Sequence, residues 1–181
     1  MLEDPFKKYD PQILEVVRNF RLLDDDFMTK VFEDKACLEL MLQIVMDIPT
    51  LKVKSFHIQD TLKNIQGRSV RFDVWAEDDA HTQYNIEVQR ADKGAGTKRA
   101  RYNSAMLDAN ITQPGDDCTD LPKTYVIFIT ENDILGKGQL CYRIERRYRV
   151  ERTGQYEVFD DDAHILYVNA AYEDASTALG K

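Results

Sequence analysis

The sequence lacks the features that mark membrane and secreted proteins. It has no apolar run approaching the roughly 18 residues that a transmembrane helix needs, so we expect no membrane span. Its first residues do not follow the basic-then-apolar order of a signal peptide, and we expect a cytoplasmic protein. Neither repeats nor low-complexity segments interrupt the 181 residues, which suggests one globular domain over residues 1–181.

Cysteine and histidine are also scarce, with three residues of each. Cys37, Cys118 and Cys141 are scattered along the chain, a distribution that fits neither a disulfide framework nor a zinc site. Cys37 falls on the apolar face of a segment with helical periodicity, so we expect it in the core. The histidines are isolated and show no spacing typical of metal ligands.

Basic charge is in deficit, because 24 Lys and Arg stand against 32 Asp and Glu, for a net charge of −8. This balance argues against general affinity for nucleic acids, since phosphate contacts need cations. Two stretches differ. Residues 90–101 hold five basic residues and one acidic residue, and residues 143–152 hold five arginines and two glutamates. A local basic strip is therefore expected, with the first stretch the better candidate and the second better read as solvated surface.

Two runs of alternating apolar and polar residues are the most informative part of the chain. They cover residues 69–76 and 83–89, with a short polar segment between them. Alternation of period two predicts β-strands, and the short polar connection predicts a hairpin. The alternation also predicts that Phe72 and Val74 share one face of the first strand.

This hairpin would bring two carboxylates together. If the turn centres on Ala80, Asp73 lies opposite Glu87 and Arg71 lies opposite Gln89, with Cβ atoms roughly 5 Å apart in each pair. Two opposed carboxylates repel each other unless a cation neutralises them, and Mg²⁺ prefers such oxygen ligands. The alternative is an ordinary hairpin whose charges point into solvent. Acids that point to opposite sides of the sheet, or that are held by a permanent arginine partner, would end the case for phosphodiester chemistry.

The spacing of these residues resembles a known active-site signature. Asp73, followed by thirteen residues and then Glu87-Val88-Gln89, is similar to the signature of the PD-(D/E)XK nuclease superfamily, and within it to the Rpn-type, transposase-like branch of recombination-promoting nucleases. Segments that resemble this branch occur in the same order along the chain: DDF (25–27), GRSVRFDV (67–74), YNIEVQ (84–89), KRARY (98–102) and LPKTYVIFIT (121–130).

The resemblance implies a fold. It implies an α/β protein with a restriction-endonuclease-like αβββαβ core, in which helices flank a mixed central sheet, together with extra C-terminal strands. Residues 1–22 would form a helical extension before this core. Members of the branch usually continue with helical sequence, so the C-terminal end is expected to be shortened.

The resemblance also implies roles for residues in the hairpin. Asp73 and Glu87 would be catalytic and would bind Mg²⁺ or Mn²⁺, with the carbonyl of Val88 completing the site. Gln89 stands where the superfamily name has Lys, and a neutral amide can orient water or phosphate only by hydrogen bonding. Asp26 has three interpretations: a helix N-cap, which we favour, an additional metal ligand, or a solvated acid.

A helix expected from Thr97 to about Ile111 would follow the active-site strand. Lys98, Arg99 and Arg101 would face outward near the site and contact DNA phosphates, as would Arg90 before the helix. Tyr102 lies three residues after Arg99 and hence on the same side of the helix. It would either join these contacts or pack in the core.

We therefore expect a Mg²⁺-dependent DNA endonuclease that hydrolyses phosphodiester bonds and is associated with transposition or recombination. DNA is the expected partner, and a homodimer would suit double-strand cutting. The main alternative is a catalytically inactive, nuclease-derived module that binds DNA or protein. A two-carboxylate glycoside hydrolase ranks last, because the chain has one Trp and no evident sugar cleft.

Overall fold

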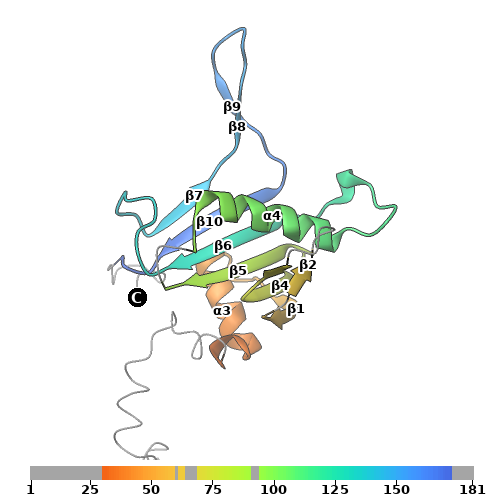
Figure 1. Ribbon diagram of the computed structural model, residues 1–181, viewed down its shortest axis with the longest axis vertical. Helices are drawn as coiled ribbons and strands as arrows, with labels where there is room; N and C mark the ends of the chain where they lie inside the picture. Colours follow the sequence, from red (N-terminus) through yellow and green to blue (C-terminus); the bar gives the residue numbers. More distant parts are fainter. Residues whose placement is uncertain (1–29, 60, 64–68, 91–93, 173–181) are drawn as a thin grey trace, which may run out of the picture.

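The computed structural model describes residues 30–59, 61–63, 69–90 and 94–172. The predicted extension over residues 1–22 lies outside these ranges, as does Asp26. Two helices lie on opposite sides of a central sheet, α4 in front of it and α3 behind it (Figure 1). The helix bounds are α3 Lys35–Met46 and α4 Thr97–Ile111.

The central sheet has six strands in the order β1-β4-β5-β6-β10-β7. Its strands are β1 Val53–Ile58, β4 Val74–Asp78, β5 Gln83–Gln89, β6 Thr124–Thr130, β7 Cys141–Ile144 and β10 Ala163–Asn169. Strands β5, β6 and β10 run parallel, whereas the β1–β4, β4–β5 and β7–β10 pairs are antiparallel. Helix α4 makes the crossover that the parallel β5–β6 pair requires. The predicted αβββαβ order around a mixed sheet is confirmed.

Each face of the sheet has its own core. Tyr84, Ile86 and Val88 of β5 pack toward α3, where Leu38 and Leu42 are fully buried. On the other face, Val126 and Phe128 of β6 pack with Ala100 of α4, and Met106 and Leu107 of α4 pack with Phe72. Polar side chains of β5 that point toward α4 are therefore buried beneath this helix.

The helical segment that contains Cys37 begins at Lys35. Asp34 ends a first helical turn and caps α3, where its side chain accepts a hydrogen bond from the Ala36 N–H at 2.8 Å. The apolar stripe of α3 then runs through Leu38 and Leu42. Cys37 lies one position off this stripe and is exposed, so the prediction that it joins the core is wrong.

The expected extra C-terminal strands are present, but they do not all join the central sheet. After β7, β8 Arg147–Arg149 pairs with β9 Tyr156–Val158 in a separate two-stranded sheet. A second small sheet joins β2 Thr61–Lys63 and β3 Ser69–Arg71. Within the described ranges, neither helix combines the length and the apolar character that crossing a membrane requires.

Candidate metal centre

The first alternating run breaks where the site begins. Its residues divide between β3 and β4, and the chain turns at Phe72 and Asp73 between them. Phe72 packs under α4 with Leu107, whereas Val74 points into the core beside α3. The prediction that Phe72 and Val74 share one face is therefore wrong, because the irregular backbone at Asp73 interrupts the alternation.

The same break changes one predicted cross-strand pair. Strands β4 and β5 pair in the expected register, with Trp75 opposite Asn85, but the ladder ends at Val74 and Ile86. Arg71 belongs to β3 and pairs with Thr61, so its predicted pairing with Gln89 is wrong.

Asp73 stands one step beyond the end of this ladder and is anchored by the neighbouring strands. Its backbone carbonyl accepts a hydrogen bond from the Gln59 N–H at 2.8 Å. Its carboxylate Oδ2 accepts the Val88 N–H, also at 2.8 Å. The side chain is thus directed toward β5 beside Glu87, and Asp73 is half-buried.

Glu87 is buried in the middle of the sheet. Its exposed fraction is 0%, so the alternative of a solvated hairpin face is wrong for this residue. Burial and, second to it, the negative charge of Asp73 raise the pKa of Glu87 to about 7, against the opposing effects of Asn85 and Arg99. The two acids therefore interact electrostatically in a region from which water is largely excluded.

Both oxygens of Glu87 accept hydrogen bonds from neighbouring side chains. Oε1 accepts one from Asn85 Nδ2 at 3.0 Å, and Oε2 accepts one from Arg99 Nη2 at 2.9 Å. The Arg99 side chain is 42% exposed, so solvent reaches this ion pair. Each carboxylate oxygen has a second lone pair. The pKa of Glu87 stays raised, by burial first and by Asp73 second, although Arg99 lowers it.

Two buried asparagines extend this polar site and had no predicted role. Asn85 and Asn103 are 0% and 1% exposed, and Asn103 Nδ2 donates to Asn85 Oδ1 at 3.4 Å. The Oδ1 atom of Asn103 is buried without a hydrogen-bond partner in the described part of the chain. Their positions in the sequence relative to Glu87 and Arg99 could have indicated that they belong to the site. Asn85 lies two residues before Glu87 on the same face of β5, and Asn103 lies one helical turn after Arg99.

Gln89 lies against a glycine that follows the strand. A Cβ atom placed on Gly94 would be 1.5 Å from Gln89 Oε1 and 2.4 Å from Gln89 Cδ. The absence of a side chain at Gly94, itself buried, is therefore what lets the Gln89 amide occupy its position. The Gln89 carbonyl accepts the Glu131 N–H at 3.0 Å and ties the end of β5 to the residues after β6.

The predicted DNA-contacting residues lie at the end of β5 and along α4. Arg90, Lys98 and Arg101 are exposed. Tyr102 is half-buried and packs against the cluster that contains Phe72, as its core-packing alternative expected. Thr97 opens α4, with Gly96 rather than Thr97 at the N-cap.

The donor set suits a hard divalent cation. Asp73 and Glu87 supply carboxylate oxygens, the ligands that Mg²⁺ and Mn²⁺ favour. Along β5, Gln83 and Gln89 bond toward β6, so the intervening even-numbered residues direct their backbone groups toward β4. The Val88 carbonyl therefore faces the same side of β5 as the Val88 N–H, where Asp73 lies. A cation would also relieve the repulsion that raises the pKa of Glu87.

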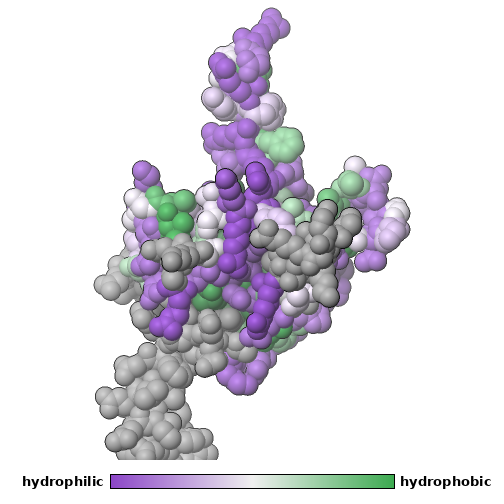
Figure 2. Space-filling model, in the orientation of Figure 1, coloured by the Kyte–Doolittle hydropathy of each residue, from purple (hydrophilic) through white to green (hydrophobic). Residues whose placement is uncertain are grey.

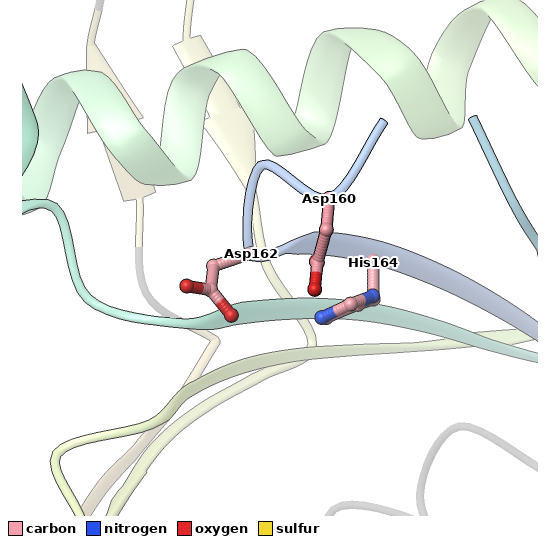
Figure 3. Close-up of side chains that lie close together, drawn as sticks. All are labelled: Asp160, Asp162 and His164. Atoms are coloured by element: carbon pink, nitrogen blue, oxygen red, sulfur yellow. The ribbon is translucent and has the colours of Figure 1, made fainter. Parts of the chain in front are cut away.

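A second group of metal-binding side chains lies elsewhere. The ligand atoms of Asp160, Asp162 and His164 lie within 4.8 Å of one another (Figure 3). Lys123 Nζ already lies 3.0 Å from Asp162 Oδ1. His164 is aligned with Tyr125 near the beginning of the parallel strands, whereas Glu87 lies near their end. This group is thus no part of the Asp73–Glu87 site.

Comparison with known proteins identifies a family. A family model described as PD-(D/E)XK nuclease family transposase matches residues 27–175. The match spans both helices, the central sheet and every described site residue. A search of curated proteins and a search of solved structures returned no match.

Proposed function

We propose that this chain, which belongs to the PD-(D/E)XK nuclease family transposases, is a metal-dependent endonuclease that hydrolyses phosphodiester bonds in DNA. Family membership supports nuclease-type chemistry. The observation that carries the more specific proposal is the buried carboxylate of Glu87, whose pKa is raised to about 7 by burial and by Asp73. A protein gains nothing in stability from such a pair, but a divalent cation would bind between the two acids.

Asp73, Glu87 and the carbonyl of Val88 would hold Mg²⁺ or Mn²⁺. The ion would polarise the scissile phosphate and make the attacking water more acidic. Gln89 orients the water or a phosphate oxygen by hydrogen bonding from its amide. Asp26, for which an additional metal ligand was one alternative to the favoured helix N-cap, lies outside the described residues.

Arg99 has two partners in this proposal. Its guanidinium pairs with Glu87 in the absence of DNA, and its exposed side chain can rotate toward a phosphate that enters the site. Guanidinium groups bind phosphate in a bidentate geometry. Lys98 and Arg101 add positive charge along the exposed side of α4, and Arg90 adds it at the end of β5. Tyr102 lies half-buried on the same helix.

We expect the purified protein to convert supercoiled plasmid into nicked and linear forms with Mg²⁺ or Mn²⁺, and to leave it intact with EDTA. The physical reason is that Asp73 and Glu87 alone provide no electrophile for phosphate. Agarose gel electrophoresis of time courses gives the readout. Cleavage that persists undiminished in EDTA would contradict the role of the metal.

The Arg99–Glu87 ion pair favours one alternative, an inactive module that binds DNA or protein. In that case Arg99 permanently replaces the metal. Calorimetric titration with Mg²⁺ separates the two, because the nuclease should bind the ion in the wild type and lose binding in Glu87→Gln. An inactive module should give no metal binding in either protein and no cleavage at any metal concentration.

Gly94→Ala should lower the cleavage rate by about 10- to 100-fold, the range expected when one positioned polar group is lost. The new Cβ would overlap Gln89 Oε1, and the flexible amide would move away. Initial rates on a fluorescent duplex measure the effect. Gly96→Ala is the matched control, since a Cβ there meets nothing within 4 Å.

A double variant tests whether Gly94 acts through Gln89. Activity should be equal in Gln89→Ala and in Gln89→Ala combined with Gly94→Ala, because the displaced amide is then absent. A further loss in the double variant would show that Gly94→Ala damages the site by another route.

A further inference from the structure

Strands β8 and β9 form a ribbon that stands apart from the central sheet. The two strands pair only with each other, and the ribbon rises away from the body of the molecule (Figure 1). It leaves the sheet after β7 and returns at the start of β10. Every residue of β8 and β9 is exposed, so the ribbon has no core of its own to bury.

The two faces of the ribbon differ in chemistry. Arg147 pairs with Val158, and Arg149 pairs with Tyr156, so these four side chains share one face. Tyr156 and Val158 are 64% and 51% exposed. On the opposite face, the Tyr148 hydroxyl donates to Glu157. One face therefore offers two guanidinium groups beside an exposed aromatic ring and an aliphatic side chain.

The arginines on this face remain accessible to an anion. Arg147 Nε donates to Glu145 at 2.6 Å, and Arg149 Nη1 lies 3.7 Å from Glu151. Exposed pairs of this kind are worth about 0–1 kcal/mol, so phosphate can displace the carboxylates. Arg152, beyond β8, makes no ion pair with any residue that the structure describes. Hydrophilic side chains dominate the ribbon (Figure 2).

The base of the ribbon is held beside α4. Arg146 pairs with Asp161 across the base, and Arg146 also acts electrostatically on Asp108 of α4. Nine residues separate Asp108 from Arg99 on that helix, a rise of about 14 Å. Arg99 and its basic neighbours Lys98 and Arg101 thus lie at the start of α4, and the base of the ribbon lies near Asp108, about 14 Å further along this helix.

We propose that the face of the β8–β9 ribbon formed by Arg147, Arg149 and Tyr156 binds duplex DNA beyond the cleavage position. The proposal rests on the nuclease function and adds to it a second contact with the same substrate. A two-stranded ribbon fits the major groove, and the arginines match the phosphates in charge. The 14 Å rise along α4 corresponds to about four base pairs, so the ribbon contacts DNA at least that far from the cut.

Neutralising both arginines tests the proposal by binding alone. Fluorescence anisotropy with a 30-base-pair duplex in EDTA should show about tenfold weaker binding for Arg147→Gln combined with Arg149→Gln. The plot of log affinity against log salt should lose about two units of slope, one for each phosphate contact. Lys52→Gln combined with Lys54→Gln is the matched control, because both lysines are exposed, ion-paired and on edge strand β1 or beside it.

The outcomes distinguish this proposal from the proposed function. A slope and affinity equal to those of the control variant would overturn the ribbon contact, whether or not the protein cleaves DNA. Weaker binding in the ribbon variant of a protein that never cleaves would retain the ribbon contact and reject the nuclease. A change in mass by light scattering in Tyr156→Ser, with unchanged DNA binding, would overturn the proposal in favour of a protein-binding face.

Discussion

Replacing Asp73 by Asn should reduce DNA cleavage about 10³-fold or more while the protein stays folded. Asn keeps the size of the side chain and an oxygen that can accept the Val88 N–H, but it removes the charge that would hold the metal. Loss of metal assistance costs several kcal/mol of transition-state stabilisation, and each 1.36 kcal/mol is a factor of ten. Single-turnover cleavage of a labelled duplex at saturating Mg²⁺ gives the rate.

Asp79→Asn is the control for this change, because Asp79 is exposed in the turn of the same hairpin and has no role in the proposed chemistry. Circular dichroism and the melting temperature should match the wild type in both variants. Cleavage at the wild-type rate in Asp73→Asn would end the assignment of this aspartate as a catalytic residue. Equal losses in both variants would point to a general effect of charge on the hairpin.

Replacing Glu87 by Gln should abolish cleavage and, without metal, make the protein more stable at pH 8. The folded protein holds the Glu87 proton more tightly than the unfolded chain, because its pKa is raised from 4.5 to about 7. Between these values the folded state carries a proton that the unfolded state has lost. The free energy of unfolding of the wild type therefore falls as pH rises through this window and levels off above it.

Gln has no proton to lose and lacks this dependence. The stabilisation of Glu87→Gln relative to the wild type should be absent near pH 4.5 and reach about 1–3 kcal/mol at pH 8, as an order of magnitude. Urea unfolding in EDTA at several pH values measures it. Glu77→Gln is the control, because the pKa of Glu77 is shifted in the opposite direction: the hydrogen bond from Lys54 lowers it. Removing the Glu77 carboxylate should therefore not stabilise the protein. A less stable Glu87→Gln at pH 8 would mean that Arg99 and Asn85 outweigh the cost of burial.

Local patterns in the sequence were enough to predict the hairpin. The alternation around Glu87 identified β5, its partner β4 and their register, because period-two patterns report which side chains share a face. These features depend on neighbours in sequence, whereas the αβββαβ order was expected from the resemblance to the PD-(D/E)XK branch.

What the sequence left open depends on packing between distant segments. The pairing of Arg99 with Glu87 requires α4 to pack over β5 at a particular position along the strand. The spacing of residues in the sequence does not specify that position. The contact of Gly94 with the Gln89 amide is of the same kind. The face to which Phe72 points was predicted wrongly for a different reason. A one-residue irregularity in a strand reverses the faces to which the preceding side chains point. The positions of the two carboxylates were thus easier to predict from the sequence than the side chains that contact them.

The burial of β5 along nearly its whole length has a kinetic consequence. Hydrogen-bonded strands on both sides should make its amides among the slowest in the protein to exchange with solvent. The backbone that carries Glu87 would then be ordered before any nucleic acid arrives. Rotation of the exposed Arg99 side chain, a motion of picoseconds to nanoseconds, would be the fastest rearrangement required. Slow steps in turnover should therefore come from deforming or releasing the DNA.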